Sequence, residues 1–144
     1  MITSVRRMID DKSEVFSVGP DDSVYTALRL MAEKNIGAVV VLEHGRIVGI
    51  LSERDYARKV ILHGKSSRET SVAEIMTPDV ITIDPTWTAE QCMALMTERR
   101  IRHLPVVDRD RLVGIVSIGD AVRAVLDEQL QVISSLERYI ASGG

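Results

Sequence analysis

The ten residues RIVGILSERD, from Arg46 to Asp55, are written a second time as RLVGIVSIGD, from Arg111 to Asp120. The match extends outward from this stretch without a gap, because Val15 to Asp55 aligns with Val80 to Asp120 and 13 of the 41 aligned positions carry the same residue. An internal duplication decides the architecture before any single motif does. The sequence therefore predicts two similar units that face each other, with paired clefts between them.

The duplication also sets the domain organisation. Thr3-Ser4-Val5 recurs as Thr70-Ser71-Val72, so each repeat includes a segment upstream of the aligned stretch. A unit of about 65 residues is marginal on its own, which favours a single pseudo-symmetric module with a shared core. We place repeat one at 1–64, a linker at 65–71, repeat two at 72–128, and an extended C-terminal helix and tail at 129–144.

Each repeat is predicted to run strand, helix, strand, strand, helix. In the first copy a strand covers 15–18, and Asp22 or Ser23 can cap the following helix. The continuous apolar run 39–42 is typical of a strand covered on both faces, and Gly45 occupies the turn of the hairpin that follows. The apolar stripe of the first helix comprises Val24, Ala27, Leu28 and Met31 in copy one and Ala89, Cys92, Met93 and Met96 in copy two.

The second helix of copy one begins at Asp55 or its neighbour and ends at Gly64. Its inward residues are predicted to be Ala57, Val60 and Ile61. The polar stretch 63–70 is typical of a flexible linker. Ser71 and Glu74 form a capping box, which predicts a short helix before the first strand of repeat two.

The last helix of repeat two continues beyond the duplicated span. Its apolar residues are spaced by three or four positions and are Val122, Leu126, Leu130, Ile133, Leu136 and Ile140. An apolar stripe that outlasts its own domain needs another surface to cover it, and a second copy of the chain is the expected cover. The predicted fold class is α/β (α+β): two pseudo-symmetric repeats packed through their sheets, plus a long C-terminal helix.

The strongest functional signal is a serine followed three residues later by an aspartate, where a strand gives way to a helix. Ser52 with Asp55 and Ser117 with Asp120 both occupy this place, each after a Gly-apolar-apolar sequence. The backbone N–H groups and the dipole of a helix N-terminus attract anions. The serine hydroxyl can donate to a phosphate oxygen, and the carboxylate can accept from the two hydroxyls of a ribose. The alternative is that both pairs only cap helices, but their duplication in register favours a ligand.

A second signal is the basic run Arg99-Arg100-Ile101-Arg102-His103 in a chain of net charge −3. Copy one has Gly37-Ala38 in place of Arg102-His103, so the fold does not require charge at this point. Charge in contact with solvent is the ordinary explanation of such a run. The position at a sheet edge favours a phosphate contact by Arg102 or His103.

Composition argues against several other functions. The hydrophobic set makes up 45% and charged residues 27%, an ordinary globular balance. A net charge of −3 argues against general affinity for nucleic acid or an anionic membrane, and one Phe, one Trp and three Tyr are too few for a base-stacking surface. With one cysteine, no signal peptide and no long apolar run, a cytoplasmic protein is expected.

The sequence offers no catalytic or metal-binding group. His44, His63 and His103 lack metal-ligand spacing, so no metal site is predicted. Cys92 matches Ala27 in the helix stripe and is interpreted as a core residue rather than a nucleophile. No triad, paired carboxylates or phosphate-binding glycine loop supports catalysis, so the chain is not expected to be an enzyme.

Both repeats resemble CBS domains, the cystathionine-β-synthase motif, and together they resemble a CBS pair or Bateman module. The resemblance covers nearly the whole chain and rests on Ile75-Met76-Thr77, on the run from Arg102 to Asp108, and on the two Gly-x-x-Ser-x-x-Asp ends. It implies a regulatory module that binds an adenosine-containing ligand such as AMP, ADP, ATP or NAD between the repeats. No catalytic cofactor is implied.

The resemblance also implies two composite sites, each with the Ser/Asp end of one repeat facing the other repeat. Site A would combine Ile50, Ser52, Arg54, Asp55, Val80, Ile81, Arg102 and His103. Site B would combine Ile115, Ser117, Gly119, Asp120, Val15, Phe16, Gly37 and Ala38. Site A carries more positive charge and suits several phosphates, whereas a monophosphate or a weaker ligand suits site B.

The resulting hypothesis is a homodimeric sensor of adenosine nucleotides that acts on a protein effector in trans. The alternative is a dimerisation or interaction module with empty clefts.

Overall fold

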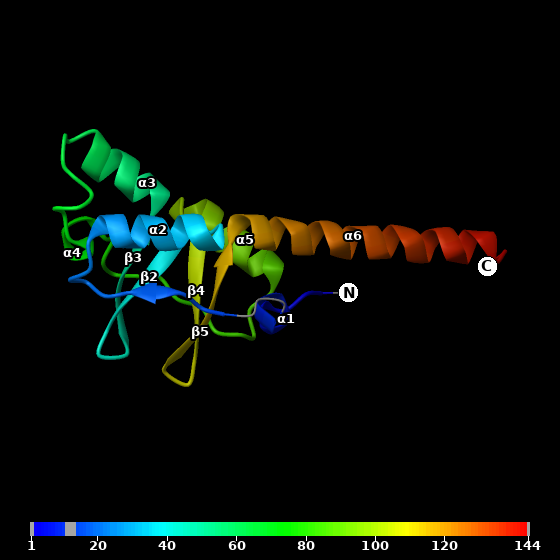
Figure 1. The fold of residues 1–144 in the computed structure, drawn as a ribbon. Helices are drawn as coiled ribbons and strands as arrows, with labels where there is room; N and C mark the ends of the chain where they lie inside the picture. The colour runs from blue at the N-terminus through cyan, green and yellow to red at the C-terminus, as the bar shows by residue number, and fades with distance from the viewer. Residues whose placement is uncertain (1, 11–13, 144) are drawn as a thin grey trace. The chain divides into compact units, whose positions relative to one another are not determined.

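The computed structural model describes residues 2–10 and 14–143. The chain divides into two compact units (Figure 1). One unit is Phe16–Ile81, and the other joins the residues up to Val15 to those from Thr82 onward. The units differ from the sequence repeats, because the N-terminal segment belongs with the second repeat.

The first unit is built on a three-stranded sheet in the order β1-β2-β3. Strand β1 (Ser17–Val18) runs parallel to β2 (Ala38–Glu43), which pairs antiparallel with β3 (Arg46–Ser52). The first strand is therefore shorter than the predicted 15–18. Helix α2 (Val24–Lys34) packs on this sheet. The buried core comprises Val18, Val24, Ala27, Met31, Val39, Val41, Leu51, Val60, Val72 and Ile75.

Helix α2 begins and ends as the sequence indicates. Ser23, rather than Asp22, caps it, because its Oγ accepts a hydrogen bond of 3.1 Å from the amide of Thr26. Asn35 ends the helix in the left-handed conformation, with φ of 54°. Of the predicted apolar stripe, Val24, Ala27 and Met31 are buried and Leu28 is partly buried.

The second helix of repeat one differs from the prediction. It starts as α3 (Glu53–Tyr56) and changes into the π-helical turn η1 (Ala57–Ile61). Within this turn Val60 is buried, whereas Ala57, its first residue, is exposed and Ile61, its last, is 55% exposed. The inward positions predicted for Ala57 and Ile61 are therefore wrong. Gly64, with φ of 67°, ends the segment as expected.

The polar stretch 63–70 is fixed to the start of α2 rather than spanning open space. The carbonyls of Thr70 and Ser67 accept from the amides of Val24 and Tyr25, both at 2.9 Å. Thr70 is buried, and the Arg68 guanidinium lies 3.9 Å from the centre of the Tyr25 ring. This linker is thus part of the first unit.

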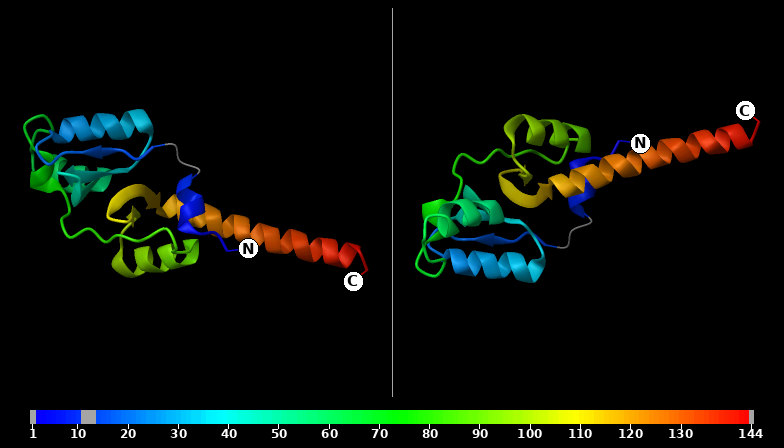
Figure 2. Two further views of the ribbon diagram at one scale, coloured as in Figure 1. Left: turned by 90° about the horizontal axis from the view of Figure 1, so that it is seen from below. Right: turned by 90° about the horizontal axis from the view of Figure 1, so that it is seen from above.

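The second unit repeats the plan with a smaller sheet. Strand β4 (His103–Asp108) pairs antiparallel with β5 (Arg111–Ser117), and the first strand is reduced to one parallel bridge between Ile83 and Val106. Helix α5 (Ala89–Arg99) has the capping residue Thr88. Helix α6 (Ile118–Ala141) then runs without interruption through residue 128, where the sequence divided repeat two from the extended helix. Figure 2 shows α6 continuing well beyond its own sheet.

Two short helices complete the units, and each packs on the repeat that it does not precede. Helix α1 (Val5–Asp10) comes before repeat one but contacts β5. Helix α4 (Val72–Ile75), which starts at the predicted capping residue Ser71, comes before repeat two but contacts β3. The sequence predicted the second of these helices from its capping box, made no prediction of a helix at 5–10, and did not reveal the exchange.

The exchange explains a glycine in each hairpin. A Cβ on Gly49 would lie 2.5 Å from Sδ of Met76, and a Cβ on Gly114 would lie 2.7 Å from Cγ2 of Ile9. Gly49 leaves room for Met76, the residue that follows α4, and Gly114 leaves room for Ile9, which lies within α1. The predicted fold class is confirmed: the molecule has two α+β repeats and a long C-terminal helix.

Candidate functional site

The site in the first unit forms where β3 ends and α3 begins. Ser52 is the capping residue, and Asp55 is the third residue of the helix. The Oδ2 atom of Asp55 accepts from the amide and the hydroxyl of Ser52, both at 3.0 Å, and the amide of Asp55 donates to Ser52 Oγ at 3.1 Å. Ser52 and Asp55 therefore cap α3, as the sequence allowed.

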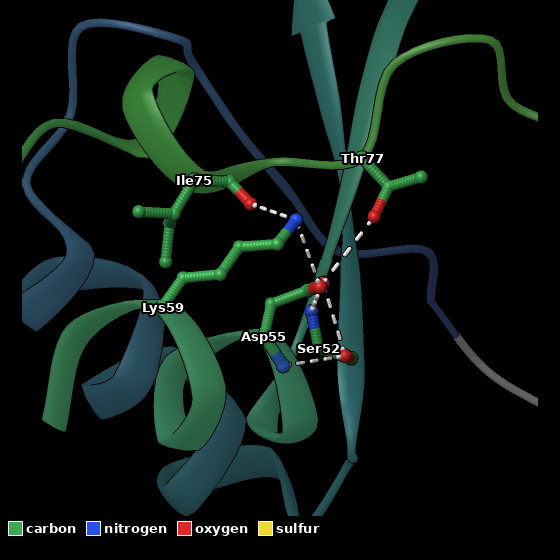
Figure 3. A network of polar contacts seen from close by, with 5 residues as sticks. All are labelled: Ser52, Asp55, Lys59, Ile75 and Thr77. Carbon is green, nitrogen blue, oxygen red and sulfur yellow. Dashed lines mark hydrogen bonds and ion pairs between the residues drawn. The ribbon is translucent and has the colours of Figure 1, made fainter. Parts of the chain in front are cut away.

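The other oxygen of Asp55 has partners of its own (Figure 3). The Lys59 ammonium lies 3.4 Å from Oδ1 and donates to the carbonyl of Ile75 at 3.0 Å. The Thr77 hydroxyl donates to the same Oδ1 at 3.5 Å. The Asp55 side chain is only 16% exposed, so one carboxylate with four donors forms the polar centre of this unit.

Sequence reasoning missed Lys59 and gave Thr77 no role. Thr77 arrives at the site because its amide and carbonyl form two hydrogen bonds with Ile50, of 2.9 and 3.0 Å. A sequence signal existed for Thr77, since it ends the Ile75-Met76-Thr77 stretch that follows a predicted helix. A sequence signal existed for Lys59 too, since it follows Asp55 by four positions, the spacing of an ion pair on one face of a helix.

The site in the second unit has the same Ser–Asp capping box, but different residues surround its aspartate. The amide of Ser117 donates to Asp120 Oδ2 at 2.9 Å, and the amide of Asp120 donates to Ser117 Oγ at 3.1 Å. Arg123 lies 3.8 Å from Asp120 Oδ1. At the positions that correspond to Lys59 and Thr77, repeat two has Ala124 and the N-terminal segment has Asp10. The two sites are therefore chemically unequal.

The remaining predicted residues lie on both units. His103 pairs with Ser117 across the β4–β5 ladder, and Ala38 pairs with Ser52 across β2–β3. The carbonyls of Arg102 and Gly37 accept from the first amides of α6 and α3, at 2.9 and 3.1 Å. Arg102 and His103 are thus next to Ser117 in their own unit, and Gly37 and Ala38 are next to Ser52. The sequence had assigned each pair to a site with the other repeat.

The positions expected to meet an adenine lie beside the first strand of each repeat. Val15 is 38% exposed, and Phe16 is half-buried with the Lys34 ammonium 5.1 Å from its ring centre. Val80 and Ile81 are half-buried and belong to the same unit as Ser52. Ile50 and Ile115 are half-buried, whereas Arg54 and Gly119 are exposed.

Amides at these helix starts are partly committed to the protein. The amides of Ser52, Glu53 and Asp55 all donate to protein oxygens, so they offer an anion less than the sequence suggested. An anion at this point would depend more on side chains such as Lys59 and Thr77.

The pKa of the buried Cys92 thiol is raised to about 11 by desolvation, which agrees with its interpretation as a core residue.

Within residues 2–10 and 14–143, no group of three or more His, Cys, Asp or Glu side chains is arranged to hold a metal ion. In the same part of the chain, every helix is too short or too polar to cross a lipid bilayer.

Two α+β repeats, each with a Ser–Asp capping box where its hairpin meets a helix, define a tandem-repeat module. The model of the CBS domain family matches residues 5–62 and, a second time, residues 72–127. The chain belongs to the CBS domain family and carries a tandem pair of these domains.

Known proteins similar to this chain share the same architecture. It is 44% identical over 128 residues to "CBS domain-containing protein CBSX3, mitochondrial" of Arabidopsis thaliana, covering 85% of this chain and 62% of that protein. It is 36% identical over 108 residues to "CBS domain-containing protein YhcV" of Bacillus subtilis, covering 75% of this chain and 76% of that protein. A solved structure from Burkholderia ambifaria, described as a putative signal-transduction protein with CBS domains, matches with a TM-score of 0.84 and 47% identity over 88% of this chain and 96% of its own.

Proposed function

We propose that this CBS pair is a regulatory sensor that binds adenosine nucleotides and has no catalytic activity of its own. The observation that carries the proposal is the repetition of one polar constellation. A serine and an aspartate with the same internal hydrogen bonds end the hairpin of both repeats, at Ser52–Asp55 and Ser117–Asp120. The similarity to a protein described as a putative signal-transduction protein supports a regulatory role.

In this proposal each aspartate accepts from a ribose, and basic and hydroxyl groups hold the phosphates. Site A is proposed to use Ser52, Arg54 and Asp55 together with Arg102 and His103, and site B to use Ser117 and Asp120. The Lys59 ammonium adds a further positive charge beside Asp55, where repeat two has Ala124. This difference supports the assignment of the more highly phosphorylated ligand to site A.

The competing function is an interaction module whose Ser–Asp pairs serve only as caps. One observation favours it: Asp55 already has four donors from the protein itself. A ribose would have to replace the Thr77 and Lys59 contacts. These two contacts are the longest of the four, at 3.5 and 3.4 Å, so they are the ones that a ligand exchanges most readily.

A homodimer in the cytoplasm that acts on an effector protein completes the proposal. The exposed apolar stripe of α6 supports a dimer, and the free, fully buried Cys92 is consistent with a reducing compartment. Nucleotide is proposed to change the packing of the repeats or the dimer, and thereby a surface that the effector contacts.

A thermal melt tests nucleotide binding directly. AMP, ADP, ATP and NAD are each added to the full chain, and a ligand at one hundred times its dissociation constant is expected to stabilise the fold by about 2.7 kcal/mol. Guanosine nucleotides at the same concentration serve as the control. Equal melting temperatures with all of these compounds would support the empty interaction module instead.

Chromatography after incubation with ATP or NAD tests for turnover. Because the proposed sensor has no catalytic activity, both compounds are expected to remain unchanged.

A further inference from the structure

Helix α6 exposes one apolar face along its whole length. The exposed fractions of its six stripe residues range from 37 to 75%, for Val122, Leu126, Leu130, Ile133, Leu136 and Ile140. The polar face of α6 forms one wall of a groove of about 790 Å³ against the N-terminal segment, and Leu130 of the stripe and Arg123 also line this groove. Arg7, Asp127 and Arg138 are among the charged residues that line this groove.

The two faces are therefore used differently. The polar face is partly covered by the chain itself, since the amide of Thr3 donates to the Glu128 carboxylate and Met8 lines the groove beside Ala124. The apolar face keeps more than a third of every stripe residue exposed. A contiguous apolar surface of this kind marks an interaction site.

The spacing of the apolar residues along α6 indicates that a second straight helix can cover this stripe. From Val122 to Ile140 the six residues are separated by 4, 4, 3, 3 and 4 positions, which averages the 3.6 residues of one straight helical turn. The stripe consequently follows the helix axis for roughly 27 Å without drifting around it. A second straight helix with the same stripe fits it along its full length, and every other copy of this chain carries such a helix.

The charges beside the stripe set the direction of the second helix. At about 100° per residue, Arg123 and Glu137 lie on the same flank of the stripe. Residues on the same flank meet when two helices pack antiparallel, so Arg123 of one copy would lie opposite Glu137 of the other, twice, around a two-fold axis near Leu130. In a parallel pair this flank would meet the opposite one, which presents Val125 and Tyr139. The side chain of Arg123 is 74% exposed and its ion pair with Asp120 is long, at 3.8 Å, so it is available to a partner.

We infer that two copies of the chain associate through their α6 helices in the antiparallel orientation. This inference deepens the homodimer proposed above and depends on it, but it is independent of nucleotide binding. Opposite charges on facing flanks select one orientation of a helix pair, because the other orientation leaves them without partners.

Two cysteine variants measure the orientation. In the antiparallel pair Leu126 of one copy lies near Leu136 of the other, whereas two copies of Leu126 are about 12 Å apart along the axis, too far for a disulfide. Under mild oxidation, Leu126→Cys alone and Leu136→Cys alone are each expected to remain uncrosslinked. Their equimolar mixture is expected to give a covalent heterodimer on a non-reducing gel. The native Cys92 does not interfere, because it is buried and its pKa is raised to about 11.

Leu130→Cys, next to the proposed axis, is the control, since it crosslinks to itself in either orientation. If Leu126→Cys and Leu136→Cys each form a covalent homodimer, and their mixture forms no covalent heterodimer, the pair is parallel. That result would overturn the inference. A dimer by light scattering in which Leu130→Cys does not crosslink would place the interface elsewhere. A monomer by light scattering would remove the proposed homodimer itself.

Discussion

At the scale of single residues, Asp55 and Asp120 show how a duplicated motif acquires two environments. Both carboxylates accept from the amide of their capping serine. Asp55 then meets Lys59 and Thr77, whereas Asp120 meets Arg123. The identical residues of the two repeats thus predict the hydrogen bonds between serine and aspartate. The residues that contact each aspartate decide the charge of its site.

The variant Asp120→Ala tests the ribose role. Loss of a charged acceptor is expected to weaken binding by about 1.5–3 kcal/mol, or roughly 10- to 150-fold. Titration calorimetry with the nucleotide that gives the largest thermal shift measures the change. Asp127→Ala, on the same helix and away from the capping box, is the matched control. Unchanged affinity at both sites in Asp120→Ala would reject the role.

Gly49 is a residue whose importance comes from the neighbouring element. A methyl group there would lie 2.5 Å from Sδ and 2.8 Å from Cγ of Met76, so Gly49→Ala is expected to lower the free energy of unfolding by about 1–3 kcal/mol. Urea denaturation measures it. Gly19→Ala serves as the control, because the nearest atom to its new Cβ would be at 3.6 Å.

The double variant Gly49→Ala/Met76→Ala separates the clash from other causes. Shortening Met76 removes the atoms that the new methyl group meets, so the two changes together are expected to be less destabilising than the sum of the single changes. Strict additivity would mean that the packing of the segment after α4 on β3 is not the reason for the glycine.

At the scale of elements, the two hairpins make the same turn with different residues. His44 and Gly45 have φ of 52° and 77°, and Arg109 and Asp110 have φ of 51° and 63°. Two consecutive left-handed residues suit the twist of the strands. The first turn meets this need with glycine, whereas the second places two side-chain-bearing residues there.

Gly45→Ala tests the backbone requirement alone, since no atom lies within 4 Å of its new Cβ. The left-handed conformation disfavours alanine, so a loss of about 1 kcal/mol of unfolding free energy is expected. Gly119→Ala is expected to have the opposite sign, because Gly119 lies in α6 without a positive φ and alanine favours a helix by roughly 1 kcal/mol. Equal effects of the two changes in urea denaturation would contradict this account.

At the scale of the whole molecule, the exposed stripe of α6 is the proposed interface of the homodimer. Ile133→Glu places a charge in the middle of the apolar face, and burying that charge is expected to weaken the dimer by about 2 kcal/mol or more, on the order of 30-fold. Light scattering across a dilution series measures this change. Ser135→Glu adds the same charge to the polar face, where Ser135 lines the groove, and is expected to leave the dimer intact. Equal weakening by both variants would exclude the apolar face as the interface.

The sequence by itself determined the duplication, the order of the elements, the capping residue Ser71 and the exposed stripe of α6. These features are local or periodic, and helix caps, glycine turns and apolar spacing are encoded within a few residues of where they act. The Ser–Asp pairs belong to this group, because a capping box needs only residues three positions apart.

Tertiary structure alone decided the exchange of α1 and α4 between the repeats, the arrival of Thr77 at Asp55, and the exposure of Ala57 and Ile61. Each depends on contacts between segments that are distant along the chain, or on a π-helical turn that no local pattern announced. Ile50 and Thr77, for example, are joined by backbone hydrogen bonds, and backbone groups carry no sequence signature. Residue patterns report which face a side chain prefers, whereas the partner that covers that face is selected by the packing of the complete chain.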